Sequence, residues 1–295
     1  MKDTKSSRAA TEAGLNPSDI KKFVETARYA SKEGGKILME YYGKIDSIKS
    51  KKYEGDLVTK ADVEAEKRVL EILNDNTPGV SILAEESGSQ GNQEHIRWCV
   101  DPLDGTTNFA HGYPFFATSV GLTWNGISLL GSIEIPYLKQ NYWAAPGLGA
   151  YCNDKLISTS KTSKLSSSLL VTGFAYDRQE RLDNNYAEFC WLTHRTRGVR
   201  RGGAAAVDLA FVAAGKVDGY WERGLSEWDL AAGVSIVELA GGSISDYSGN
   251  EFDLSSGRIV ACSPGIKTEL ISVLSKVKPL KGEMFGAPEL TSLGS

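Results

Sequence analysis

Histidine and cysteine are scarce in this chain of 295 residues. It has three histidines, and its four cysteines, Cys99, Cys152, Cys190 and Cys262, lie far apart and form no CxxC pair. This scarcity argues against a zinc cage of soft ligands and against a disulfide framework. A chain of this length buries enough apolar surface to fold without either. We therefore expect free, reduced thiols.

Basic residues in excess and long apolar runs are also lacking. The formal net charge is -4, so we do not expect the broad positive surface of a nucleic-acid-binding protein. No stretch approaches the length of a membrane span, and residues 1–17 contain no apolar core of signal-peptide length. We expect a cytoplasmic protein without a membrane partner. The alternative is the plastid stroma, if the Ser- and Lys-containing leader is a trimmed transit peptide.

The apolar pattern divides the chain into two lobes between two tails. We expect a flexible tail over residues 1–17, an N-terminal α+β lobe over 18–155, a C-terminal α/β lobe over 156–280, and a second tail over 281–295. The first lobe begins with helical patterns and continues with short strand-type runs between residues 81 and 145, separated by turns. The second lobe alternates strands with helices, which predicts a layered arrangement.

Carboxylates stand at five places where an expected strand or helix begins or ends. They are Asp62, the pair Glu85-Glu86, Asp101 with Asp104, Glu222 and Asp229. Hard divalent cations prefer oxygen ligands, and magnesium in particular combines a few carboxylates with water and a substrate phosphate. The set therefore predicts a site for a hard divalent cation such as magnesium, which a substrate phosphate can join.

The densest acidic segment is the sequence WCVDPLDGTTNF at residues 98–109. An apolar strand delivers Asp101 to its carboxyl end, and the turn fixed by Pro102 brings Asp104 back toward the same ion. A lone acidic turn of this kind is more often structural, as an Asx-turn or a helix cap. The carboxylates elsewhere in the chain favour the metal-site interpretation.

Small residues near the acidic segments suit a phosphate and its alcohol. Gly105 allows close backbone approach, and the amides of Gly105 and Thr106 at a helix start can bind phosphate oxygens. The segment GGAAA at residues 202–206 would leave room for a polyol ring, or is simply a tight helix start. Asp229 has its own structural alternative as a helix cap.

Three separated motifs resemble those of the inositol monophosphatase family. They are the sequence AEES at residues 84–87, the run WxxDPLDGTTNF at 98–109, and Trp228-Asp229 followed by an Ala-Ala-Gly helix. The likeness extends from about residue 20 to 280. It implies a layered αβαβα sugar-phosphatase fold, with two sheets interleaved with helices, and a homodimer.

The resemblance also implies roles for individual residues. It places metal ligands at Glu85, Asp101, the Leu103 carbonyl, Asp104 and Asp229, with Asp62 supporting a further ion, so that two or three Mg²⁺ ions bind. It assigns catalysis to Glu85 and Thr106, which orient the attacking water, together with Asp101. It assigns substrate contacts to Asp104, Gly105, Thr106, Ala205, Glu222, Asp229 and Lys51.

The implied reaction is hydrolysis of a phosphomonoester by metal-activated water, without a protein nucleophile. Cys99 is no candidate nucleophile, because it lies in an apolar strand without a neighbouring histidine. The residues Thr107-Asn108-Phe109 resemble the inositol monophosphatase branch, which favours inositol 1-phosphate as substrate. Galactose 1-phosphate, histidinol phosphate and fructose 1,6-bisphosphate are alternatives, because members of the family are often broad in specificity. Residues 172–177 depart from the animal enzymes, and residues 173–178, with Arg200-Arg201 downstream, resemble bacterial and plastid members.

The alternative from another class is a binding protein that has kept the fold and joins RNA or a transcription complex. The complete set of expected metal carboxylates argues against this as the sole function.

Overall fold

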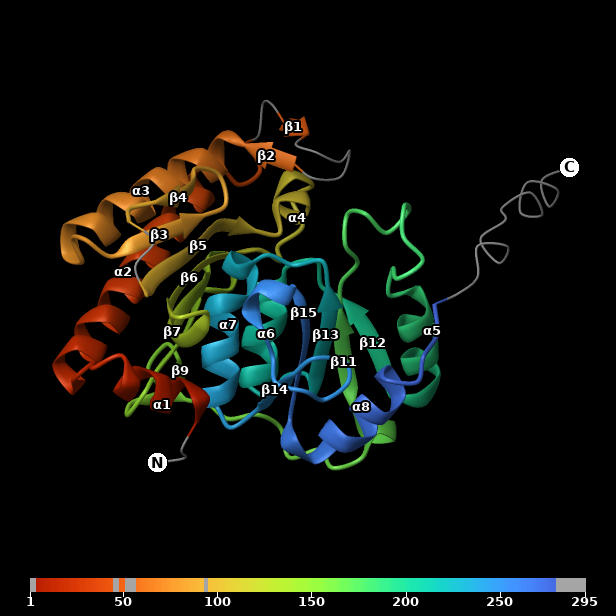
Figure 1. Ribbon diagram of the computed structural model, residues 1–295. Helices are drawn as coiled ribbons and strands as arrows, with labels where there is room; N and C mark the ends of the chain where they lie inside the picture. Colours follow the sequence, from red (N-terminus) through yellow and green to blue (C-terminus); the bar gives the residue numbers. More distant parts are fainter. Residues whose placement is uncertain (1–3, 45–47, 51–56, 93–94, 280–295) are drawn as a thin grey trace, which may run out of the picture.

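The computed structural model describes residues 4–44, 48–50, 57–92 and 95–279 (Figure 1). Two sheets, two helices between them and helices on both outer faces form five layers. This confirms the predicted αβαβα arrangement. Within the described ranges, no helix is long and apolar enough to cross a membrane.

The first sheet has eight strands in the order β10-β9-β8-β7-β6-β5-β3-β4. Its bounds are β3 (Ser81–Ala84), β4 (Gly88–Gln90), β5 (Ile96–Asp104), β6 (Ala117–Trp124), β7 (Ile127–Ile135), β8 (Gln140–Ala145), β9 (Gly149–Cys152) and β10 (Lys155–Leu156). Most neighbours are antiparallel hairpins, because turns such as Asn125-Gly126, with φ of 48° and 77°, reverse the chain tightly. The strand-type runs predicted between residues 81 and 145 are thereby confirmed. A separate ribbon joins β1 (Ile48–Ser50) to β2 (Leu57–Thr59).

The second sheet has five strands in the order β12-β11-β13-β15-β14. Its bounds are β11 (Leu169–Thr172), β12 (Gly198–Arg201), β13 (Gly219–Arg223), β14 (Ser243–Ser245) and β15 (Arg258–Cys262). Strands β12 and β13 flank β11 in parallel, whereas β15 runs antiparallel to both of its neighbours. The carboxyl ends of β11, β12 and β13 therefore meet at one edge of the sheet.

Helices complete the layers. Helices α2 (Pro17–Tyr41) and α3 (Lys60–Asn76) pack together on the outer side of the first sheet, α6 (Ala205–Ala213) and α7 (Glu227–Leu239) lie between the sheets, and α5 (Tyr186–Arg195) and α8 (Lys267–Leu274) lie outside the second. Gly121 and Gly131 let α7 press against β6 and β7, since a Cβ at Gly131 would lie 2.4 Å from Ala232 Cα. The short helix α4 (Thr106–Ala110) follows β5 directly.

The prediction of a flexible tail over residues 1–17 is wrong for the helix α1 (Lys5–Glu12). Ala9 and Ala10 are buried in the core of the first lobe, and the Ser6 hydroxyl donates a hydrogen bond to Glu238 Oε2 of α7 at 2.7 Å. The apolar stripe of this helix is only two alanines wide, too weak a pattern to indicate packing. The tail predicted over residues 281–295 lies outside the described residues.

Candidate active site

The acidic turn breaks the register between β5 and β6. The pairing shifts between Asp101 and Asp104, and Asp101 Oδ1 accepts a hydrogen bond from the Leu103 backbone N–H at 2.9 Å. This local bond is the Asx-turn expected of such a sequence. Gly105 follows with φ of 88°, and a Cβ there would lie 3.0 Å from Phe115 O, so glycine is required.

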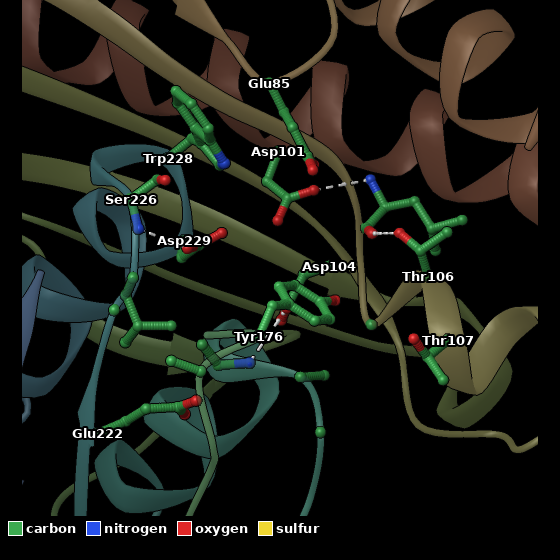
Figure 2. Close-up of a pocket in the computed structure, with 18 of the residues that line it drawn as sticks. Glu85, Asp101, Asp104, Thr106, Thr107, Tyr176, Glu222, Ser226, Trp228 and Asp229 are labelled. Atoms are coloured by element: carbon green, nitrogen blue, oxygen red, sulfur yellow. Dashed lines mark hydrogen bonds between the residues drawn. The ribbon is translucent and has the colours of Figure 1, made fainter. Parts of the chain in front are cut away.

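A cavity of about 300 Å³ opens between the carboxyl end of β5 and the second lobe. The predicted site residues that line it are Glu85, Asp101, Leu103, Asp104, Gly105, Thr106, Ala205, Glu222 and Asp229. Figure 2 shows the Glu85 and Asp101 carboxylates pointing toward one another, with those of Asp104 and Asp229 below them in this view. Residues more than a hundred positions apart therefore share one pocket.

Asp104 joins the two lobes. Its Oδ1 accepts the Ala205 N–H at 3.1 Å and its Oδ2 accepts the Ala206 N–H at 2.7 Å. These two amides belong to the first turn of α6, where backbone N–H groups lack helical partners and favour a negative charge. The carboxylate is thus held in one orientation at the pocket wall.

Asp229 caps its helix and also lines the pocket. It is the third residue of α7, and its Oδ2 accepts the Ser226 N–H at 2.7 Å in a capping box. The structural alternative for this residue is therefore correct, yet it does not exclude a role in the site.

The pocket carboxylates repel one another in a poorly solvated space. Burial raises the pKa of Asp101 well above its usual range, and the charges of Glu85, Asp104 and Asp229 raise it further. Burial raises the pKa of Asp104 and of Glu222 to about 7, and that of Asp229 to about 8. A cation among these groups would relieve both effects.

The donor set fits a hard divalent cation. The predicted ligands offer carboxylate oxygens and one carbonyl, and neither histidine nor cysteine lines the cavity. In the part of the chain that the structure describes, no three Asp, Glu, His or Cys side chains stand in a ready coordination geometry.

Asp62 lies behind Thr106 rather than in the pocket lining. Its Oδ2 accepts from the Thr59 N–H at 2.9 Å and from the Thr59 hydroxyl at 2.5 Å, while Oδ1 lies 3.2 Å from Thr106 Oγ1. Thr106 Oγ1 also lies 3.0 Å from Leu103 O. The structure thus gives Asp62 a role in fixing Thr106, and its support of a further ion stays a prediction. Lys51 lies outside the described residues.

Glu222 is fixed by its neighbours on the second-lobe side. The Tyr220 hydroxyl donates to Glu222 Oε2 at 2.6 Å. A Cβ at Gly173 would lie 2.1 Å from Glu222 Oε1, so the glycine leaves room for this carboxylate.

Cys99 is not suited to act as a nucleophile. It is fully buried, and burial raises the pKa of its thiol to about 12.

Arg201, at the end of β12, also lines the cavity and was not predicted as a site residue. Phe174, Tyr176 and Trp228 line it as well. The signal for Arg201 was weak, because β12 is a four-residue edge strand whose sequence GVRR has no apolar alternation. Only its parallel pairing with β11 brings its carboxyl end to the pocket.

The family model and two of the similar proteins found by comparison point to the same family. A model described as the inositol monophosphatase family matches residues 19–278. An inositol-1-monophosphatase from Synechocystis sp. is 48% identical over 268 residues, which cover 90% of this chain and 93% of that protein. The structure of an inositol monophosphatase from Anabaena (Nostoc) sp. matches with a TM-score of 0.82 and 48% identity, covering 89% of this chain and 98% of that one. A Nus factor SuhB from Pasteurella multocida is 35% identical over 258 residues, which cover 87% of this chain and 96% of that protein.

Proposed function

The chain belongs to the inositol monophosphatase family of metal-dependent phosphatases, and from this premise we propose that it hydrolyses inositol 1-phosphate to inositol and inorganic phosphate. The observation that carries the proposal is the pocket itself. Carboxylates from β5, the end of β3 and α7 converge there beside the polar second-lobe wall that contains Glu222. Such a pocket has an acidic half, which would hold cations that neutralise a phosphate, and a polar half, which would bind hydroxyl groups.

The cofactor in this proposal is magnesium, as two or three ions. The ligands would be Glu85, Asp101, the Leu103 carbonyl, Asp104 and Asp229, with Asp62 supporting a further ion. When bound, such ions supply an activated water and neutralise charge on the phosphate. The support is the oxygen-only donor set and the raised pKa of its carboxyl groups.

The chain's own residues would orient the reactants. Glu85 and Thr106 would orient the attacking water, and Asp62 would hold the Thr106 hydroxyl in place. The amides of Gly105 and Thr106 would bind phosphate oxygens. The residues assigned to the alcohol hydroxyls are Asp104, Ala205, Glu222 and Asp229, with Lys51 as a further substrate contact.

Three finer features belong to the same proposal. The protein would act as a homodimer, lithium would inhibit it, and it would reside in the cytoplasm or, with a trimmed transit peptide, in the plastid stroma. Galactose 1-phosphate, histidinol phosphate and fructose 1,6-bisphosphate are the alternative substrates, and a panel of these esters assayed with magnesium ranks them.

The enzyme assay has a clear matched control. Phosphate release from inositol 1-phosphate should require magnesium and should fall at least about 100-fold in Asp101→Asn and Glu85→Gln, because each variant removes a ligand charge. Asp154→Asn, an equivalent change at a fully exposed carboxylate, should retain full activity. Full activity in Asp101→Asn would disprove the assigned ligand role.

The relative named as a Nus factor favours a second candidate function, binding to RNA or a transcription complex. A pull-down with the Asp101→Asn variant separates the two functions. Retention of RNA polymerase or RNA by this inactive variant would support a second, activity-independent role, and absence of both would leave the phosphatase alone.

A further inference from the structure

Arg201 presents its guanidinium group to the pocket. It lines the same cavity as Glu222, and its positive charge acts on the buried carboxylates of Glu222 and Asp208, although no hydrogen bond or ion pair found within the described residues involves its guanidinium. The guanidinium is planar and offers several N–H donors in a fixed fork. Donors that face a cavity without a protein partner are available to a ligand.

Gly203, two residues after Arg201, leaves space for this guanidinium. A Cβ at Gly203 would lie 2.2 Å from Arg201 Nη1, and Gly203 has φ of 85°, which favours glycine. The tip of the Arg201 side chain therefore lies across Gly203, beside the start of α6 and Ala205. In the glycine segment that the sequence suggests as room for a polyol ring, Gly203 leaves room for the Arg201 guanidinium, whereas Gly202 leaves room for Asp208 and Phe115.

The neighbouring arginine points elsewhere. Arg200 Nη1 lies 3.4 Å from Val199 O and packs near Gly198, and Arg200 does not line the cavity. Successive side chains of a strand point to opposite faces, which accounts for the difference. Arg200 is thus a matched control with the same charge, on the same strand.

Arg201 and Glu222 together form a donor and an acceptor on the alcohol side of the pocket. Glu222 is held by Tyr220, and its carboxylate keeps further lone pairs for a ligand. A hydroxyl group both donates and accepts, so two neighbouring hydroxyls can be bound by one acceptor and one donor. A monophosphate of a polyol carries such hydroxyls next to the ester.

We propose that Arg201 is a specificity-determining residue, which donates a hydrogen bond to one hydroxyl of the substrate's alcohol while Glu222 accepts one from a neighbouring hydroxyl. This inference rests on the proposed phosphatase function and names the class of ester that the site prefers: a monophosphate whose alcohol has adjacent free hydroxyls.

The test compares two esters with the same six-membered ring, inositol 1-phosphate and cyclohexyl phosphate, which has no hydroxyls. In Arg201→Gln, kcat/KM for inositol 1-phosphate should fall about tenfold, as expected for loss of one charged hydrogen bond, and that for cyclohexyl phosphate should change less than about twofold. Arg200→Gln should leave both within about twofold. Arg201→Lys should recover part of the loss, since it restores a donor without the fork.

The outcomes separate the two proposals. If the wild-type protein with magnesium hydrolyses neither ester, the proposed phosphatase function is refuted. Hydrolysis of both with equal losses in Arg201→Gln, or with no loss, would overturn the role of Arg201 alone. A fructose 1,6-bisphosphate arm gives a further contrary result: a loss confined to the bisphosphate would assign Arg201 to a second anionic group. If the wild-type enzyme hydrolyses galactose 1-phosphate instead of the inositol ester, the loss of kcat/KM in Arg201→Gln is compared between galactose 1-phosphate and cyclohexyl phosphate in the same way.

Discussion

Asp104 Oδ2 accepts the backbone N–H of Ala206 at 2.7 Å and so ties the end of β5 to the first turn of α6. The bond joins a strand of the first sheet to a helix of the middle layer, directly under the pocket. We therefore expect the stability of the protein and its proposed function to depend on the same carboxylate. Asp101, three residues earlier, gives a comparison, because among the described residues it accepts a backbone N–H only within its own turn and otherwise contacts the pocket carboxylates of Glu85 and Asp229.

We expect Asp104→Asn to be less stable than Asp101→Asn by about 2 kcal/mol in urea unfolding of the metal-free protein. Both variants remove one of the repelling charges. The amide introduced at position 104, however, can accept from only one of the two backbone N–H groups of α6, because its NH₂ group would face the other. Leaving that N–H without an acceptor should cost about 1–3 kcal/mol. The amide carbonyl introduced at position 101 can still accept from Leu103. Equal unfolding free energies would show that the bonds to α6 contribute nothing.

Gly131→Ala should destabilise the protein by about 3 kcal/mol or more. The added methyl group would lie 2.4 Å from Ala232 Cα, and a backbone atom of a central helix cannot move away without disturbing both sheets. The control is Gly14→Ala, where φ is 73° but no atom lies within 4 Å, so that only backbone strain of about 1 kcal/mol applies. Thermal unfolding of both variants provides the comparison, and similar melting temperatures would contradict the tight contact.

Helix α1 gives a prediction about the N-terminus. Ser6→Ala removes the hydroxyl that donates to Glu238 and should lower the unfolding free energy by about 1–2 kcal/mol, because the carboxylate loses a buried partner. Thr11→Ala, on the exposed side of the same helix, removes only a bond to the helix's own Ser7 carbonyl and should cost less than about 0.5 kcal/mol. Matching losses would mean that α1 is not docked through Ser6.

The sequence predicts best where chemistry and periodicity coincide. The strand that delivers Asp101 and the helix that begins before Asp229 were predictable, since apolar runs end there in turn and cap residues. The pocket could be expected because several carboxylates share the ends of elements. The distances between site residues of the two lobes could not be predicted, because they depend on how α6 and α7 pack between the sheets.

The parts that escaped prediction have weak local signals. Arg201 enters the pocket through the pairing of a short edge strand, and α1 docks through two alanines and a serine. Asp62 illustrates a subtler case, because its position at a helix start is evident from sequence while its contact with Thr106, 44 residues away, is not. Long-range contacts of this kind are fixed by the tertiary arrangement and leave no periodic pattern.

The titration of the pocket gives the final prediction. Asp104 and Glu222 have a pKa of about 7 and Asp229 of about 8 in the folded protein, whereas unfolded carboxyl groups titrate near pH 4. Between these values the folded state binds more protons than the unfolded state, so stability falls as pH rises from about 4 to 8. The metal-free protein should therefore lose at least about 2 kcal/mol between pH 5.5 and 8, since one pKa unit on one group corresponds to about 1.4 kcal/mol.

Magnesium should reverse most of this loss, because a cation favours the charged carboxylates that high pH produces. Melting temperatures in a chelator and in excess magnesium, at pH 5.5 and pH 8, test both statements. Asp101→Asn removes a carboxyl whose pKa burial and the charges of Glu85, Asp104 and Asp229 raise well above its usual range, so its metal-free stability should depend less on pH than that of the wild-type protein. Asp154→Asn, at an exposed carboxylate, should keep the wild-type slope. A metal-free protein that is equally stable at both pH values would show that its pocket carboxyl groups titrate near pH 4, as they do when fully solvated.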